Sequence, residues 1–187
     1  MILPVVAYGD PVLKKMGEEI EENQLPAIKK LIEDMWETMY NAQGVGLAAP
    51  QIGQSLRLFL VDSEQLEDIE NGIKKAFLNP IIEEENGEEW NYNEGCLSIP
   101  HIREDVSRKP KIKISYFDED FNFIEEEYDG INARIIQHEY DHVEGILFTD
   151  KLSGMKKRMI KKKLEEIAKG NVSIGYKMKF PMAKKRR

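Results

Sequence analysis

The sequence predicts an α+β fold, and three observations support this prediction. Runs of alternating apolar and polar residues, which are typical of strands, are short, and two of them within residues 111–128 flank Asp-Glu-Asp as in a β-hairpin. One amphipathic helix is expected early, at 25–43, and two more are expected late, at 130–145 and 150–170. Short strands joined by hairpins, with helices gathered towards the end of the chain, favour the α+β class.

The elements follow in order along the chain. Apolar residues recur at helical spacing from Ile28 to Met39, and Pro26 suits a first helical turn. The segment after this helix, GVGLAAPQIG (44–53), is expected to form a loop. The remaining expected elements are a strand at 56–62, an exposed acidic connection at 64–72, a strand at 75–82 with a break near Asn79-Pro80, an extended run at 88–100 that ends at a proline, the hairpin at 111–128, and the helices at 130–145 and 150–170.

The overall composition limits the classes of protein to which the chain can belong. The chain has 187 residues, of which 41% are hydrophobic and 33% charged, as expected for one soluble globular domain with a real core. No apolar run approaches the length that spans a bilayer, and the first residues lack the pattern of a secretory signal, so we expect an intracellular, cytoplasmic protein. Cys96 is the only cysteine, which excludes an internal disulfide.

The sequence His138-Glu139-Tyr140-Asp141-His142 matches the pattern H-E-x-x-H. Side chains four residues apart lie on one face of a helix, so the two imidazoles can bind one metal ion. Glu139 projects about 100° away, where it can reach a water bound to the metal. The alternative is a pair of histidines on a helix surface.

A third ligand has three candidate sources. The extension H-E-x-x-H-x-x-G-x-x-H keeps its glycine as Gly145 but has Phe148 at the ligand position, and phenylalanine cannot bind a metal. A glutamate on the following helix, Glu165 or Glu166, would complete a zinc peptidase site. The remaining candidate is Cys96, and two imidazoles with one thiolate leave a fourth position open for a water.

Three segments resemble the signature motifs of the peptide deformylase family, in their usual order: GVGLAAPQIG (44–53), EGCLSIP (94–100) and QHEYDH (137–142). GDPVLKKMGEEI (9–20) is also similar, and the likeness covers essentially the whole chain. The resemblance implies a metal-dependent hydrolase that removes the N-formyl group from the N-terminal methionine of newly made polypeptides and releases formate. It also implies antiparallel β-sheets packed around a central helix that carries H-E-x-x-H, plus a C-terminal helix.

The resemblance also implies the roles of individual residues. Metal-bound hydroxide would attack the formyl carbonyl, with Glu139 as general acid–base. The side-chain amide of Gln51 and the backbone N–H of Leu97 would stabilise the oxyanion. The implied metal ligands are Cys96, His138 and His142. This ligand set suits one divalent ion, Fe²⁺, Zn²⁺, Co²⁺ or Ni²⁺, and the family implies ferrous iron in the cell.

A peptide substrate is expected to pair with the uncovered backbone of Gly44 and Gly46 as an added strand. Glu94 and Gln137 are candidates to orient ligands or a loop. The expected substrate-binding residues are Val45, Gly46, Glu94, Gly95, Arg103, Ile131 and Ile135, of which Val45, Ile131 and Ile135 would form the methionine pocket. Many family members have an apolar residue at the position of Arg134, which leaves the pocket details open. His101 is expected to be exposed and not a ligand.

Charge is unevenly distributed along the chain. Residues 151–187 contain 14 Lys or Arg and two Glu, a net charge of +12, whereas residues 1–150 carry −19. We expect residues 1–150 to form the catalytic deformylase domain, with the basic C-terminal helix and tail, 151–187, as part of the same domain. The basic segment predicts an anionic partner such as the ribosome, or a solvated helix face; a non-catalytic RNA-binding module is the alternative. A monomer without membrane contact is expected.

Overall fold

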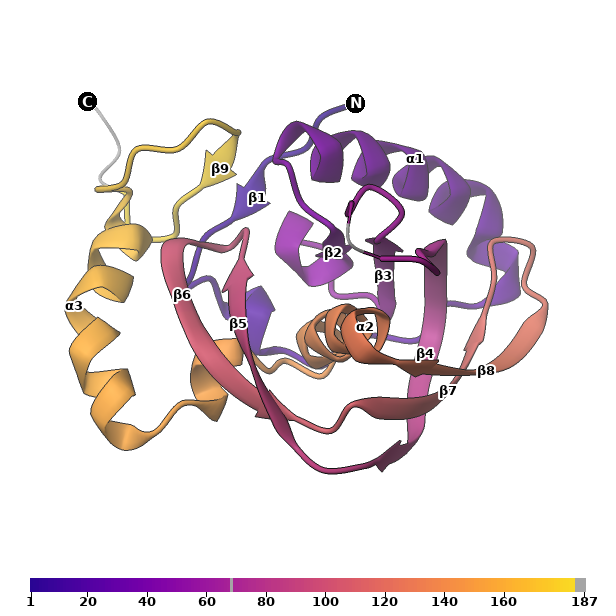
Figure 1. Cartoon of the computed structure of the whole chain (residues 1–187). Coiled ribbons are helices and arrows are strands. Elements are labelled where there is room, and N and C mark those ends of the chain that lie inside the picture. Colours follow the sequence, from indigo (N-terminus) through magenta and orange to yellow (C-terminus); the bar gives the residue numbers. More distant parts are fainter. Residues whose placement is uncertain (68, 184–187) are drawn as a thin grey trace.

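A computed structural model describes residues 1–67 and 69–183 (Figure 1). Its strands and α-helices are β1 (Val5–Val6), α1 (Leu25–Asn41), β2 (Gly46–Ala48), β3 (Leu58–Asp62), β4 (Lys74–Asn86), β5 (Trp90–Cys96), β6 (Ile99–Arg108), β7 (Lys111–Phe117), β8 (Phe123–Asp129), α2 (Gly130–Val143), α3 (Gly154–Lys169) and β9 (Met178–Lys179). Four 3₁₀ turns accompany them in the described ranges: η1 (Pro11–Lys14), η2 (Glu22–Gln24), η3 (Ala49–Ile52) and η4 (Phe148–Lys151). Residues 184–187 of the expected basic tail lie outside the described residues.

A five-stranded antiparallel sheet, in the order β2-β3-β4-β7-β8, lies between α1 and α2. Alternate residues of a strand point to opposite faces. Leu58 and Leu60 of β3 accordingly pack in a cluster with α1, whereas Phe59 and Val61 pack in a cluster with α2. All four side chains are fully buried, so the sheet is apolar on both faces and fixes both helices.

α2 is the central helix, with the five-stranded sheet on one side and the β5–β6 hairpin on the other (Figure 1). It begins after the β7–β8 hairpin and ends before Gly145, whose φ of +75° ends the helix as expected. A Cβ at Gly145 would lie 2.8 Å from the carbonyl oxygen of Lys14, so glycine also permits the close approach of η1. The prediction of antiparallel sheets around the helix that carries H-E-x-x-H, with a C-terminal helix, is confirmed.

α3 lies outside the hairpin and packs against β6 and β1. Its buried face contains Ile160, Leu164 and Ile167, which share a core cluster with Val6 and Ile99. After α3 the chain turns back, and β9 pairs with β1 as a two-stranded parallel sheet, which the sequence did not lead us to expect. No helix within 1–67 and 69–183 has both the length and the apolar character needed to cross a membrane.

The three helix predictions are confirmed: α1 and α2 begin where expected, and the other four ends are shifted by one to four residues. The expected hairpin at 111–128 is β7–β8, and the expected break in the strand at 75–82 is a register shift between Leu78 and Ile81, where Asn79 has a φ of +49°. Strand β4 extends beyond the expected range to Asn86.

Two predictions of local structure are wrong in part. Residues 44–53 are not only loop, because Gly46–Ala48 form the edge strand β2. The glycines in this segment favoured the prediction of a loop. The run 88–100 is not one extended segment, because the chain reverses at Leu97–Ser98 and Cys96 pairs with Ile99. A turn of this sequence lacks the Gly, Pro, Asn or Asp that usually signals a reversal.

Candidate metal centre

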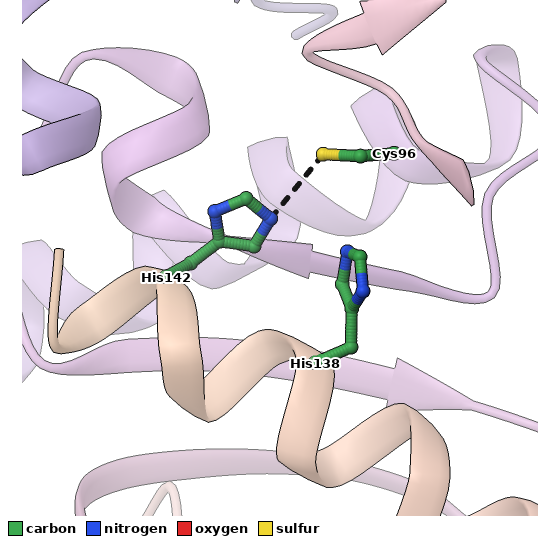
Figure 2. Close-up of side chains that lie close together, drawn as sticks. All are labelled: Cys96, His138 and His142. Atoms are coloured by element: carbon green, nitrogen blue, oxygen red, sulfur yellow. Dashed lines mark hydrogen bonds between the residues drawn. The ribbon is translucent and has the colours of Figure 1, made fainter. Parts of the chain in front are cut away.

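Two elements bring three potential metal ligands together (Figure 2). His138 and His142 lie one turn apart on α2, and Cys96 is the last residue of β5. The Cys96 Sγ lies 3.3 Å from Nε2 of His142, and the ligand atoms of all three residues lie within 4.8 Å of one another. No other such group of His, Cys, Asp or Glu occurs in the part of the chain that the structure describes.

This arrangement fits a tetrahedral metal ion. With metal–sulfur and metal–nitrogen bonds of usual length, the sulfur and nitrogen of two ligands lie about 3.5 Å apart. The observed separation of Cys96 Sγ and His142 Nε2, 3.3 Å, is close to that value. Three protein ligands of this type leave the fourth position of a tetrahedral ion available to water or substrate.

Glu94, on β5, fixes the orientation of His138. Its Oε2 lies 3.0 Å from Nδ1 of His138, and a proton on Nδ1 leaves Nε2 free to bind a metal. The Glu94 side chain is almost fully buried. Burial raises the pKa of Glu94, but the hydrogen bonds from His138 and Arg108 lower it more, and the carboxylate is held well below its usual pKa.

Two buried arginines neutralise the Glu94 carboxylate. Arg108 donates to both of its oxygens at 2.7 and 3.0 Å, and Arg134 donates to Oε1 at 3.0 Å. Arg108 also pairs with Asp141 at 2.7 Å, which carries the network back to α2. Arg134 donates to the carbonyls of Trp90 and Val106, one on each strand of the hairpin. The hairpin is therefore attached to α2 largely through buried charges.

Glu139 is buried beside the histidines and has an uncommitted carboxylate. Within the described residues, its Oε2 has no hydrogen-bond partner, and only 5% of the residue is exposed. Burial raises the pKa of Glu139 to about 7. A Cβ at Gly46 would lie 2.7 Å from Cδ and 2.8 Å from Cγ of Glu139 and closer still to Oε1, so only glycine leaves room for this carboxylate.

Gln51 in η3 faces the same centre. The N–H of Ala48 donates to its Oε1 at 2.8 Å, which turns the amide NH₂ towards Sγ of Cys96 and Oγ of Ser98, both 3.4 Å away. Leu97 lies in the turn that joins β5 to β6, directly after Cys96. The structure thus brings both expected oxyanion donors next to the ligand sulfur.

The centre opens into a cleft of about 600 Å³. Its lining includes every expected substrate-binding residue: Val45, Gly46, Glu94, Gly95, Arg103, Ile131 and Ile135. Arg103 is exposed and its guanidinium bonds to Asn93. Arg134 also lines the cleft, while its guanidinium is committed to Glu94 and the hairpin carbonyls.

Sequence reasoning missed part of this lining. Tyr92, Ile174 and Tyr176 also line the cleft. Apolar residues alternate with polar or small residues along 172–180, which was a detectable strand signal within a segment interpreted as a basic tail. Arg108 was missed too, because nothing in its local sequence distinguishes it.

The other candidates for the third ligand do not lie beside the metal-binding atoms of His138 and His142. Phe148 lies in η4, and the centre of its ring is 6.0 Å from that of His138, against which it stacks. Glu165 and Glu166 lie on α3, where Glu166 bonds to Lys169 and Asn171. His101 is exposed as expected and contacts the carbonyl of Ser173. Gln137 bonds to Glu85 and the carbonyl of Lys109, so it orients a loop and not a ligand.

Comparisons with known proteins agree with this geometry. A family model described as polypeptide deformylase matches residues 2–158. A peptide deformylase of Christiangramia forsetii is 55% identical over 197 aligned positions that cover 100% of both chains. A crystal structure of a peptide deformylase from Legionella pneumophila has a TM-score of 0.80 at 35% identity, over 91% of this chain and 98% of its own. One from Ehrlichia chaffeensis, in complex with actinonin, has a TM-score of 0.80 at 34% identity, over 88% of this chain and 96% of its own. The chain therefore belongs to the polypeptide deformylase family and is a metal-binding hydrolase with peptide deformylase activity.

Proposed function

We propose that the chain removes the formyl group from the N-terminal methionine of newly made polypeptides and releases formate. One observation carries the proposal. The sulfur of Cys96 and the ring nitrogens of His138 and His142 converge beside a cleft that also contains the buried, uncommitted carboxylate of Glu139. Three ligands with a carboxylate base next to them suit hydrolysis of an amide.

Glu139 is the proposed general acid–base. Cys96, His138 and His142 would hold a divalent ion, which would supply Lewis acidity and lower the pKa of a water. Glu139 accepts a proton at Oε2 from the attacking water as a bond forms between the water oxygen and the formyl carbon. It then gives the proton to the amine nitrogen as the C–N bond breaks. A pKa raised by burial suits both steps, because the group must accept and release a proton near neutral pH.

Gln51 and Leu97 are the proposed donors to the oxyanion. The Gln51 amide is held by Ala48, so little reorganisation accompanies charge development on the formyl oxygen. The N–H of Leu97 is the second donor, on the turn next to Cys96. Preorganised donors of this kind are worth about 10²–10³ each in rate.

The peptide is proposed to bind as an added strand. Within residues 1–67 and 69–183, β2 is an edge strand of the five-stranded sheet and β5 pairs only with β6, so each has an edge without a partner strand there. Both strands contribute residues to the cleft. The methionine side chain is assigned to Val45, Ile131 and Ile135, which belong to or pack on one apolar cluster.

The central test is Glu139→Gln, which keeps the shape of the side chain and removes its basicity. Formate release from a formyl-Met peptide should fall by about 10²–10⁴-fold, while elemental analysis still finds one metal per chain. Full activity in this variant would overturn the mechanism. Glu165→Gln serves as the control on α3 and should keep both metal and activity, whereas Cys96→Ser should lose metal.

The proposed ion in the cell is Fe²⁺, although the same ligands suit Zn²⁺, Ni²⁺ or Co²⁺. Elemental analysis of anaerobically purified protein, paired with the formate assay before and after exposure to air, tests this identity. Iron in stoichiometric amount with activity lost in air supports the proposal, and stoichiometric zinc with full activity contradicts it. Binding of actinonin, the compound bound to the Ehrlichia chaffeensis protein, is a further expected property of the cleft.

We also propose that the protein is a cytoplasmic monomer that docks on the ribosome through α3. Lys157 and Lys161 are exposed one turn apart on this helix. Reversing both charges should weaken salt-sensitive binding to ribosomes, whereas reversal of Lys29 and Lys30 on α1 should not. Substitution is preferable to truncation after residue 150, because Ile160 and Leu164 are part of the core. This shared core supports treating residues 1–150 and 151–187 as one domain.

A further inference from the structure

The segment after α3 runs along the edge of the cleft. Its side chains alternate: Val172, Ile174, Tyr176, Met178 and Phe180 are partly buried, while the residues between them are exposed. We call residues 172–180 the strap. Its backbone is bound to β1 at two points, where Val5 donates to the carbonyl of Lys177 and Ala7 donates to that of Lys179, both at 2.9 Å.

The strap contacts the turn that joins β5 to β6. The hydroxyl of Tyr176 donates to the carbonyl of Leu97 at 2.6 Å, and the backbone N–H of Tyr8 donates to the carbonyl of Ser98 at 2.8 Å. Both carbonyls of the turn are therefore held from outside the hairpin. Burial raises the pKa of Tyr176 to about 12, so the phenol keeps its proton and remains a donor.

We propose that Tyr176 is a positioning residue for the deformylation reaction. Its hydroxyl fixes the peptide plane between Leu97 and Ser98, which restricts rotation about Leu97 and so keeps the N–H of Leu97 aimed at the formyl oxygen. The turn benefits from such support, because Leu97 has no turn preference and a serine such as Ser98 favours a turn only weakly. This inference rests on the proposed role of the Leu97 N–H as an oxyanion donor.

Tyr176 is a new element of the site for this chain. The match to the family model ends at residue 158, and Tyr176 lies 18 residues beyond that limit. The contact spans 79 positions of sequence. Because Leu97 follows Cys96 directly, this hydrogen bond links the strap to the reaction centre without involving a metal ligand.

The test compares Tyr176→Phe with Tyr116→Phe in the full-length, metal-loaded protein. Each substitution removes one phenolic hydroxyl and keeps the ring; Tyr116 is fully buried and Tyr176 partly buried. Tyr116 donates to Glu126 at 2.8 Å on the far strands of the five-stranded sheet, outside the cleft lining, so it reports the general effect of a lost hydrogen bond. The measurements are kcat and KM for a formyl-Met peptide, metal content, and the thermal unfolding midpoint.

Tyr176→Phe should lower kcat about three- to tenfold, the change that one hydrogen bond supports, with KM within about twofold and metal content unchanged. Tyr116→Phe should lower the unfolding midpoint without changing kcat. The proposal is overturned if Tyr176→Phe keeps the kcat of the unmodified protein, or if only KM rises. Failure of the unmodified, metal-loaded protein to release formate would instead refute the proposed function.

Discussion

The two walls of the cleft are built differently. The wall that contains β2 is part of a five-stranded sheet, and Leu47 and Ala48 are fully buried in apolar clusters. The wall that contains β5 has only two strands and is attached to α2 through Glu94, Arg108 and Arg134. Apolar packing tolerates the loss of one contact, whereas a buried charge left without its partner is costly. The second wall should therefore be the more sensitive to single substitutions that change charge.

The largest effect is expected from Glu94→Gln. The substitution removes the only carboxylate shared by Arg108, Arg134 and His138 in the described network. The free energy of unfolding should fall by about 3–5 kcal/mol, because Arg134 loses its carboxylate partner and Arg108 keeps only Asp141 in the described network. Affinity for metal should fall about 10–100-fold, because His138 loses its orienting acceptor. Urea denaturation and competition with a chelator measure the two effects.

Glu104 provides the matched control for Glu94. It lies opposite Glu94 in the register of β5 and β6 and pairs with Lys156 at 3.0 Å on the surface. Glu104→Gln should cost no more than about 1 kcal/mol, as is usual for an exposed ion pair. Equal stability losses in the two variants would show that the charge network does not hold the second wall.

A smaller effect is expected from Gly46→Ala in the first wall. The added methyl group would meet the carboxylate of Glu139, which has to move, while the surrounding apolar packing stays in place. We expect kcat to fall by about tenfold to a hundredfold with only a minor loss of stability. Gly95→Ala, in the second wall, should have the weaker effect on kcat, because there the methyl group meets the end of the exposed Arg103 side chain. Similar losses of kcat in both variants would contradict this reading.

The smallest effect is expected from Arg134→Met. Glu94 keeps both hydrogen bonds from Arg108, and the Nε of Arg134 is buried without a partner in the described residues, which already costs free energy. Methionine fills similar volume beside Trp90. The free energy of unfolding should fall by about 1–2 kcal/mol, because the carbonyls of Trp90 and Val106 lose their donor while Glu94 keeps Arg108. A loss as large as that of Glu94→Gln would show that both arginines are essential to the wall.

Much of the fold could be predicted because the relevant signals are local. The spacing of Ile28, Met35 and Met39 predicts α1, and alternation predicts the β7–β8 hairpin. The pair His138 and His142 could be recognised for the same reason, since one turn of helix fixes their separation. Cys96 required the resemblance to a family, because only the tertiary structure brings it to the histidines.

The parts that the sequence did not reveal depend on distant partners. Arg108 matters through Glu94 and Asp141, 14 and 33 positions away. In the sequence, Gly46 resembles a turn residue, and only the structure shows that the Glu139 side chain packs against it. The reversal at Leu97–Ser98 has no local signature and is held by Tyr8 and Tyr176 from opposite ends of the sequence. These roles depend on which residues become neighbours in the fold, and the type of a single residue does not reveal its neighbours.

The pairing of β1 with β9 has a consequence for how the enzyme matures. β1 leaves the ribosome early in synthesis, but its partner at Met178–Lys179 and the hydroxyl of Tyr176 emerge only after the rest of the described core. Contacts over such sequence separations also form slowly, because a large loop must close first. A nascent copy of this chain can thus build its five-stranded sheet and α2 before the strap is available to line part of the cleft. The contact of Tyr176 with Leu97 is therefore among the last parts of the described site to form.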